Sequence, residues 1–138
     1  MARRVYFAFD YKDVFKVNQV RKAGEFIDMS RAGFGDASQW EKLKKKDEAT
    51  IKKAIDDALV GTTVTVVCVG ERTHSRKYVN YEISASRDQG NGLVGVYLPG
   101  ESGHTKPKLL DDYGAPLYAW NPDRFADWVE RAAKAAGH

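Results

Sequence analysis

Hydrophobic and polar positions along the chain divide it into short strand-like runs and longer stretches with helical periodicity. In the helical stretches apolar residues recur at i, i+3 and i+4, so that each helix has one apolar face. The strand-like runs are residues 4–9, 26–29, 63–69, 93–98 and 116–120. Regular alternation of strands and helices predicts an α/β fold, with a central parallel five-stranded sheet covered by helices on both faces.

Several helices carry recognisable end signals. Asp13 is the predicted N-cap of a first helix that ends near Gly24, and Gly61 ends the helix that precedes the third strand. Asn121 followed by Pro122 predicts the start of a terminal helix. Two apolar stripes support these helices: Ile51, Ala54, Ile55, Ala58 and Leu59 in one, and Phe125, Trp128, Val129 and Ala132 in the other. The polar stretch from Pro99 to Tyr113 is predicted to be a loop.

The charged side of the helix before Gly61 has two interpretations. Pairs spaced four residues apart, such as Glu48 with Lys52, favour a solvated face over a binding surface.

Composition limits the class of protein. A chain of 138 residues with 43% hydrophobic and 30% charged residues is typical of one soluble globular domain, residues 1–138. No run approaches the roughly 18 apolar residues that span a membrane, and the start of the chain does not resemble a signal peptide. We therefore expect a cytoplasmic protein with no membrane contact. Its net charge of +3 permits anionic ligands but gives no reason to expect nucleic-acid binding.

Two sequence features imitate sites without the right context. Gly90, Gly92 and Gly95 match the G-x-G-x-x-G string, but a dinucleotide fingerprint follows a strand and opens a helix, whereas here a predicted helix precedes the glycines. We interpret the glycines as a helix C-cap turn. The single cysteine, Cys68, lies in an apolar strand and is predicted to be a buried structural thiol.

Other nucleotide and metal classes lack their key residues. No phosphate-binding glycine loop follows the first strand, where the chain reads Asp10-Tyr11-Lys12-Asp13. The third strand ends in Val69-Gly70-Glu71, without the phospho-accepting aspartate of a response regulator. The three histidines share no ligand-like spacing, so we expect no metal site.

The helix at 76–89 places an acid where α/β proteins often carry out chemistry. It follows the third strand and a polar turn, and ligands of open α/β sheets bind outside the carboxyl ends of the strands. Tyr78 and Glu82, four residues apart, share one edge of this helix. With Ser75 as the expected N-cap, Arg76 and Lys77 lie in the first turn, which the helix dipole disfavours. Either a ligand phosphate or simple solvent exposure explains these cations.

Three segments resemble a known family. Tyr78-Val79-Asn80-Tyr81-Glu82-Ile83 is similar to the W-V-x-x-E-[IL] segment of TIR domains, with Tyr78 in place of the usual tryptophan. Arg4-Val5-Tyr6-Phe7-Ala8-Phe9 resembles the opening strand, and residues 34–40 resemble the D-x-S-x-W segment of TIR-like proteins of the bacterial Thoeris anti-phage system. The resemblance covers most of residues 3–98, and the remaining C-terminal part is shorter than in several Thoeris relatives.

The resemblance implies a flavodoxin-like TIR fold and cleavage of NAD, as substrate rather than cofactor, at the link between nicotinamide and ribose. It makes Glu82 the catalytic residue of an NAD nucleosidase or ADP-ribosyl cyclase. The product would be an ADP-ribose-derived second messenger that a separate effector protein senses during phage defence. A phage-derived activator and assembly into a homo-oligomer, with loop 30–40 as a contact, are further implications.

Topology adds candidate substrate-binding residues around Glu82. Phe9, Asp10 and Tyr11 would shape the ribose and nicotinamide pocket, with Tyr78 available for stacking. Arg72 and Arg76 would hold the diphosphate, since a guanidinium fork fits phosphate geometry. Core or surface roles remain alternatives for these residues, and the sequence leaves open whether the product is cyclic, linear or conjugated.

Two other functions also remain open. One is a nucleoside (deoxy)ribosyltransferase that uses the same glutamate, and the other is a non-catalytic TIR interaction module.

Overall fold

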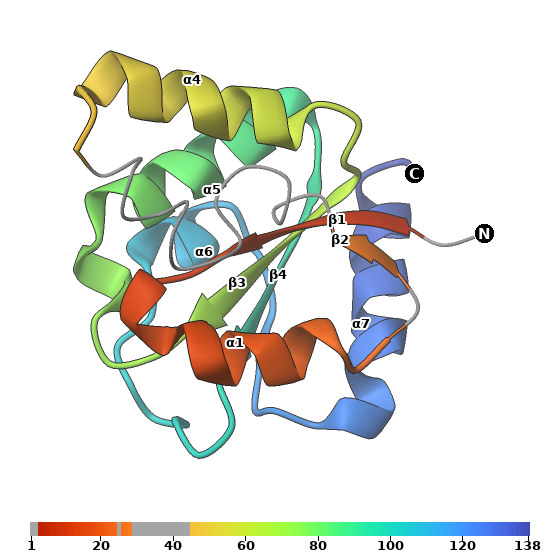
Figure 1. Ribbon diagram of the computed structural model, residues 1–138. Helices are drawn as coiled ribbons and strands as arrows, with labels where there is room; N and C mark the ends of the chain where they lie inside the picture. Colours follow the sequence, from red (N-terminus) through yellow and green to blue (C-terminus); the bar gives the residue numbers. More distant parts are fainter. Residues whose placement is uncertain (1–2, 25, 29–44) are drawn as a thin grey trace.

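A computed structural model describes residues 3–24, 26–28 and 45–138. Within these ranges five strands form one parallel sheet in the order β2-β1-β3-β4-β5 (Figure 1). The strands are β1 Arg3–Ala8, β2 Phe26–Asp28, β3 Val64–Val69, β4 Gly92–Tyr97 and β5 Leu117–Tyr118. This is the flavodoxin-like strand order, and it confirms the fold class predicted from the sequence.

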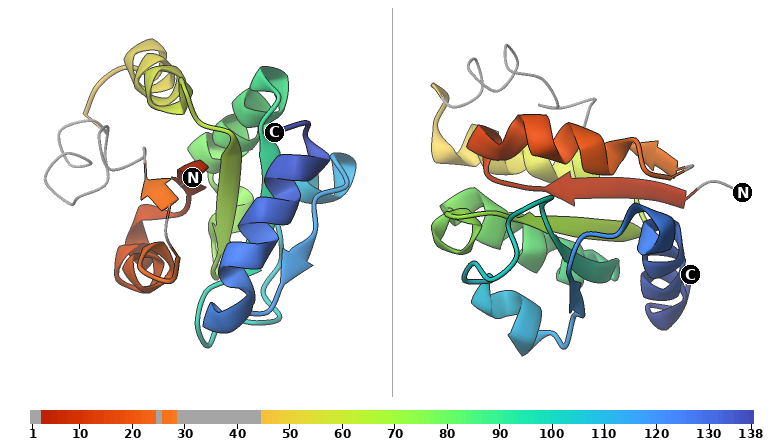
Figure 2. Two further views of the ribbon diagram at one scale, coloured as in Figure 1. Left: turned by 90° about the vertical axis from the view of Figure 1, so that its right-hand side faces the viewer. Right: turned by 90° about the horizontal axis from the view of Figure 1, so that it is seen from below.

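Helices cover both faces of the sheet (Figure 2). They are α1 Val14–Arg21, α4 Glu48–Leu59, α5 Lys77–Gln89, α6 Lys108–Asp112 and α7 Pro122–Ala135, with short 3-10 helices η1 Tyr11–Asp13 and η2 Thr73–Ser75. Helices α1 and α7 pack on one face, whereas α4, α5 and α6 pack on the other. Central strand β3 is consequently buried at all six positions.

Alternation along β1 assigns its side chains to these two faces. Val5 and Phe7 belong to the cluster under α1 and α7, whereas Tyr6 and Ala8 belong to the cluster under α4 and α5. The Tyr6 side chain, with its phenol hydroxyl, therefore lies between β1 and α5, where it is fully buried. This placement matters for the site described below.

Most helix ends follow local chemistry. The Asp47 side chain accepts a hydrogen bond of 2.8 Å from the Thr50 amide at the start of α4, and Asn121 caps α7 ahead of Pro122. Lys52 pairs with Glu48 at 2.8 Å on the outer side of α4, which confirms the predicted solvated face. Asp13 occupies the N-cap position of α1, as expected, but its side chain makes no capping hydrogen bond.

The sequence prediction was wrong at several element boundaries. The first helix ends at Arg21 rather than near Gly24, and the last strand contains only two of the five residues predicted for it. Residues 99–113, expected to be a loop, contain the five-residue helix α6 with Leu110 fully buried. One and a half turns give too few positions for an apolar period to be visible in the sequence.

The glycine string serves packing as well as capping. Gly90 ends α5 in the left-handed conformation with φ of 91°, so the C-cap interpretation is confirmed there. That interpretation is wrong for Gly92 and Gly95, which lie inside β4. A Cβ atom on Gly92 would stand 2.1 Å from the Ala132 carbonyl oxygen, so glycine lets α7 approach the strand. The arrangement is not a dinucleotide fingerprint.

Two further expectations concern the single cysteine and membrane-spanning helices. Cys68 is fully buried in β3, as predicted for a structural thiol. Among the described helices, none has the length and apolar character needed to cross a membrane.

Candidate functional site

A cavity of about 320 Å³ lies between the carboxyl end of β1 and the first turns of α5. Its walls come from β1, the following turn, the segment before α5, and α5 itself. The lining residues are Phe7, Phe9, Asp10, Tyr11, Ser75, Arg76, Lys77, Tyr78, Val79 and Glu82. The position outside the carboxyl ends of the strands is where open α/β sheets bind ligands, and the volume is at the lower end for small-molecule sites.

Glu82 is the acidic residue on the buried face of α5. This face is formed by Val79, Glu82, Ile83 and Ser86, spaced so that one stripe meets the sheet. Glu82 is only 4% exposed, and among the described residues its Oε2 atom has no hydrogen-bond partner. Burial raises the pKa of Glu82 from 4.5 to about 8, while a hydrogen bond with Tyr6 acts to lower it. A buried carboxyl oxygen without a partner is costly in a folded protein and therefore suggests a ligand.

Tyr6 is a residue that the sequence analysis did not single out. It reaches Glu82 because the alternation of β1 turns it toward α5, away from the side occupied by Phe7. The hydroxyl of a buried tyrosine usually has a polar partner, so a tyrosine in a predicted buried strand could have indicated a polar contact near Glu82.

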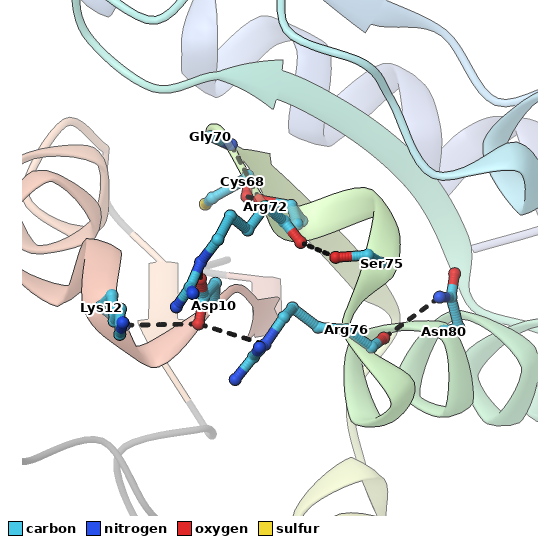
Figure 3. A network of polar contacts seen from close by, with 9 residues as sticks. Asp10, Lys12, Cys68, Gly70, Arg72, Ser75, Arg76 and Asn80 are labelled. Atoms are coloured by element: carbon cyan, nitrogen blue, oxygen red, sulfur yellow. Dashed lines mark hydrogen bonds and ion pairs between the residues drawn. The ribbon is translucent and has the colours of Figure 1, made fainter.

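Asp10 follows β1 and forms the polar wall of the cavity. It is 4% exposed, and its Oδ1 accepts a long hydrogen bond of 3.5 Å from the Lys12 amide. Two arginines face it (Figure 3): Arg72 Nε lies 3.6 Å from Oδ2, and Arg76 Nε lies 3.5 Å from Oδ1. Both contacts are ion pairs.

The start of α5 differs from the prediction. Ser75 is not the N-cap, because it belongs to η2 and its hydroxyl donates to the Arg72 carbonyl oxygen at 3.0 Å. Arg76 takes the N-cap position without a capping side chain. The two cations at this end have carboxylate partners, since Arg76 faces Asp10 and Lys77 Nζ lies 2.7 Å from Glu48 on α4. Both cations remain substantially exposed, at 46% and 61%.

Local hydrogen bonds hold the segment between β3 and α5. The Thr73 hydroxyl accepts from the Gly70 amide at 2.8 Å, and Asn80 Nδ2 donates to the Arg76 carbonyl oxygen at 3.1 Å. These bonds fix the backbone that carries Arg72 and Arg76 (Figure 3). A site supported in this way keeps its geometry before a ligand arrives.

Asp13 packs against the end of β3. A Cβ atom on Gly70 would lie 2.4 Å from Asp13 Oδ2, so a side chain there would displace the carboxyl group. Burial raises the pKa of Asp13, and the nearby charges of Asp10 and Glu101 add to the effect. Glycine at the end of β3 therefore makes room for a second acid close to Asp10.

Most of the predicted site residues come together around this one cavity. Those that line it are Phe9, Asp10, Tyr11, Arg76, Tyr78 and Glu82. Arg72 does not line the cavity and reaches it through its ion pair with Asp10. The sequence analysis did not assign Phe7, Ser75, Lys77 or Val79 to the site, and as neighbours of assigned residues in the chain they carried no separate signal. Their roles toward a substrate stay predictions.

Two other expectations concern parts of the chain or kinds of site. The segment 34–40 and the loop 30–40 lie outside the described residues. In the described ranges, no group of three or more His, Cys, Asp or Glu side chains could hold a metal ion.

Comparison with known proteins identifies the domain that carries this cavity. The family model described as "Thoeris protein ThsB, TIR-like domain" matches residues 6–103. The chain belongs to this family. The match includes residues 6–8 of β1 and the whole of β3, α5 and β4, so the cavity is part of the TIR-like domain.

A Bacillus cereus (strain MSX-D12) protein is 42% identical to this TIR-like chain over 101 residues. Its name is "Putative cyclic ADP-D-ribose synthase ThsB1". The aligned segment is 71% of this chain and 53% of the relative, so the chain spans about half the length of the curated relative it matches.

Proposed function

We propose that this TIR-like domain cleaves NAD between nicotinamide and ribose and converts the ADP-ribosyl part into a signal molecule. The observation that carries the proposal is Glu82, which is buried at the cavity and has one carboxyl oxygen without a hydrogen-bond partner in the described ranges. The name of the Bacillus cereus relative contains a cyclic ADP-ribose product and so favours a cyclic form of the signal.

The chemistry needs one carboxylate beside the ribose. When the bond between ribose C1′ and the nicotinamide nitrogen breaks, its electron pair leaves with nicotinamide, which becomes neutral. Positive charge builds up on the ribose, and a carboxylate in a water-poor site stabilises it. A nucleophile on the adenosine part then bonds to C1′ and loses its proton to solvent, which closes a ring. Water in the same position would give linear ADP-ribose.

Ionisation of Glu82 is coupled to substrate binding in this mechanism. With a pKa of about 8, the carboxyl group holds its proton at neutral pH in the free protein. The nicotinamide ring of NAD is cationic, and an opposite charge nearby favours the carboxylate form. Binding therefore releases the proton and produces the charged group just where the ribosyl cation will form.

The remaining residues of the site suit the nicotinamide ring and the diphosphate of NAD. Phe9, Tyr11 and Tyr78 offer aromatic surfaces for the cationic ring. Arg76, with Arg72 behind it, offers guanidinium groups for the diphosphate. A cavity of about 320 Å³ suits the nicotinamide riboside end, which leaves the adenosine end to lie outside it.

The biological setting is proposed from the family. A Thoeris TIR-like protein would make its signal during phage infection for a separate effector protein, in response to a phage-derived activator. Assembly into a homo-oligomer belongs to the same proposal.

The test is chromatography of NAD after incubation with the wild type, with Glu82→Gln and with Glu71→Gln. Each protein is incubated in resting lysate and in lysate from phage-infected cells. Glu71 is exposed after β3, so its variant controls for loss of a carboxylate in the same region. We expect the wild type and Glu71→Gln to consume NAD in the infected lysate, and Glu82→Gln to leave it intact.

Three outcomes would contradict parts of this proposal. Equal NAD consumption by wild type and Glu82→Gln would remove Glu82 from catalysis. No consumption by any protein in infected lysate would favour a non-catalytic interaction module. Base exchange on free nucleosides with NAD left intact would favour a nucleoside ribosyltransferase.

A further inference from the structure

We infer that Asp10 is a positioning residue, which orients Arg72 and Arg76 so that the terminal nitrogens of both guanidinium groups are presented to the diphosphate of the substrate. The inference rests on the proposed function, because it specifies how that substrate is held. It also changes the role of Asp10 from a ribose contact to a group that acts through its two arginine neighbours.

Both arginines approach Asp10 through the same atom. The Nε atom of Arg72 faces one carboxylate oxygen, and the Nε atom of Arg76 faces the other. Figure 3 shows the two side chains reaching the carboxylate from the loop and from the start of α5. Within the part of the chain that the structure describes, the terminal nitrogens of the two arginines donate no hydrogen bond, and Nε is the atom of each ion pair with Asp10.

An arginine held by its Nε still has both terminal nitrogens available for a second anion. Phosphate oxygens fit this fork in a two-point contact that a lysine cannot make. Arg72, Arg76 and Asp10 together carry a net positive charge of one, and Asp13 is a further acid that interacts with Asp10 and Arg72. The arginine side chains are 40% and 46% exposed, whereas the carboxylate is 5% exposed. The buried acid is thus the fixed element and the two cations are the accessible ones.

The backbone supports the same arrangement. Asp10 lies two residues after the end of β1 and caps η1, while Arg76 is the N-cap of α5 and the Arg72 carbonyl oxygen accepts from Ser75. Three rigid elements therefore converge on one carboxylate. Positioned charges of this kind lower the cost of ordering long side chains when a ligand binds.

The competing role, a direct contact of Asp10 with ribose, predicts a different ligand dependence. Nicotinamide riboside contains the ribose and the cationic ring but no phosphate. ADP-ribose contains the diphosphate but no nicotinamide. A positioning residue for the arginines affects binding of ADP-ribose, whereas a ribose contact affects binding of nicotinamide riboside as well.

The experiment measures binding of both probes by calorimetry to wild type, Asp10→Asn, Arg72→Lys, Arg76→Lys and the double variants that combine Asp10→Asn with each lysine. Asparagine still caps a helix, so η1 is preserved, and thermal unfolding checks that each variant is folded. Asp88→Asn is the matched control, since Asp88 is exposed near the far end of α5. In parallel, the KM and kcat for NAD are measured in infected lysate.

We expect Asp10→Asn to weaken ADP-ribose binding about tenfold, in line with the loss of charge-assisted contacts. Its affinity for nicotinamide riboside should stay within about twofold. Each double variant should be weaker than its lysine parent, but by less than the loss of about tenfold in Asp10→Asn alone, because Asp10 then has only one arginine left to orient. For NAD the loss should appear in KM, with kcat nearly unchanged.

Equal weakening of both probes would overturn the inference in favour of a ribose contact. Additive effects of Asp10→Asn and the lysine variants would overturn it as well, and so would a wild type that does not bind ADP-ribose. Because binding is measured without turnover, absence of NAD cleavage with intact ADP-ribose binding would contradict the proposed function and leave this inference supported.

Discussion

The two ends of helix α5 differ in whether the buried polar groups there have hydrogen-bond partners. Near its C-terminus, five residues form what we term the amino-end network, at the amino ends of β3 and β4: Thr62, Thr65, Ser86, Gln89 and Asn91. Asn91 Nδ2 donates to the hydroxyl oxygens of Thr62 at 2.8 Å and of Thr65 at 3.2 Å. Gln89 Nε2 in turn donates to Asn91 Oδ1 at 2.9 Å, so both the oxygen and the nitrogen of the Asn91 side-chain amide have hydrogen-bond partners.

Glu82 lies four residues before Ser86 on the same helix, and within the described part of the chain one of its carboxyl oxygens has no hydrogen-bond partner. The two positions are directly connected, since the Ser86 hydroxyl donates to the Glu82 carbonyl oxygen at 2.6 Å. A satisfied polar network stabilises and orders a core, whereas an unsatisfied one is retained at a cost in stability. The difference indicates that one end of α5 is specialised for structure and the other for a ligand.

The largest expected effect is a loss of kcat for NAD, and it distinguishes Glu82 from Ser86. We expect Glu82→Gln to lower kcat for NAD by about 1,000-fold, the size found when a transition-state charge contact is removed. Ser86→Ala should keep kcat within about threefold and lose about 1 kcal/mol of stability through its hydrogen bonds. Steady-state kinetics in infected lysate and urea unfolding measure the two quantities. If Ser86→Ala lost turnover to a similar extent, the division of α5 into two parts would be wrong.

The second effect is the pH dependence of stability. The pKa of Glu82 is about 8 in the folded protein and near 4.5 without burial, so the folded state holds the proton more tightly. Its contribution is therefore fully present below about pH 4.5 and is lost as pH rises toward 8. Relative to Glu82→Gln, the wild type should lose up to about 1.4 kcal/mol of unfolding free energy per pH unit in that window.

Urea unfolding of both proteins at three pH values between 5 and 8 tests this expectation. Parallel stability curves would show that Glu82 is ionised, or in contact with water, in the folded state. Because glutamine does not titrate, any slope shared by the two proteins arises from other groups and cancels in the difference.

A third prediction concerns the amino-end network. Asn91→Ala leaves the buried hydroxyl groups of Thr62 and Thr65 without their common donor and should lower the unfolding free energy by about 2–3 kcal/mol. The kcat and KM for NAD of the folded protein should not change. Asn80→Ala is the contrasting variant, because Asn80 is partly exposed and holds the backbone next to Arg76. It should cost about 1 kcal/mol or less and raise KM. Reversed effects of the two variants would contradict the comparison.

The sequence predicted the framework of this molecule because strands and amphipathic helices have periods that are visible residue by residue. It also identified Glu82 as a candidate site residue, from its position on the helix after β3 and from the family resemblance of the surrounding segment. Helix α6 was not predicted because five residues show too little of a helical period. These successes and failures depend on local patterns alone.

The errors at the site have a different cause, since they come from contacts between distant segments. Ser75 was expected to cap α5, but its hydroxyl binds the Arg72 carbonyl oxygen instead. Lys77 is balanced by Glu48 from α4, which no helix-dipole rule anticipates. Competition between one hydroxyl and two possible partners is decided by the tertiary fold, so propensity rules give the wrong cap.

The smallest expected effect concerns the contact between Tyr6 and Glu82, and it is seen in the pH profile of kcat/KM. That profile reports the ionisation of the free protein, so with Glu82 active as the carboxylate it should rise with pH to a midpoint near 8. The hydrogen bond with Tyr6 lowers this pKa, and Tyr6→Phe should therefore move the midpoint upward by about one unit or less. Activity at pH 7 would fall by up to about tenfold and recover at high pH.

Tyr81→Phe is the matched control for this last effect. Tyr81 is also on α5, but its hydroxyl donates to Asp56 of α4 and does not line the cavity. Its pH profile should coincide with that of the wild type. The other titratable groups that line the cavity are unchanged in both variants, namely Asp10, Tyr11, Arg76, Lys77 and Tyr78. An equal loss of activity at every pH in Tyr6→Phe would show that the phenol serves packing or substrate contact. A shifted midpoint with recovery at high pH is the result expected from a change in the pKa of Glu82, and it would connect the cavity end of α5 to Tyr6 on the strand beneath it.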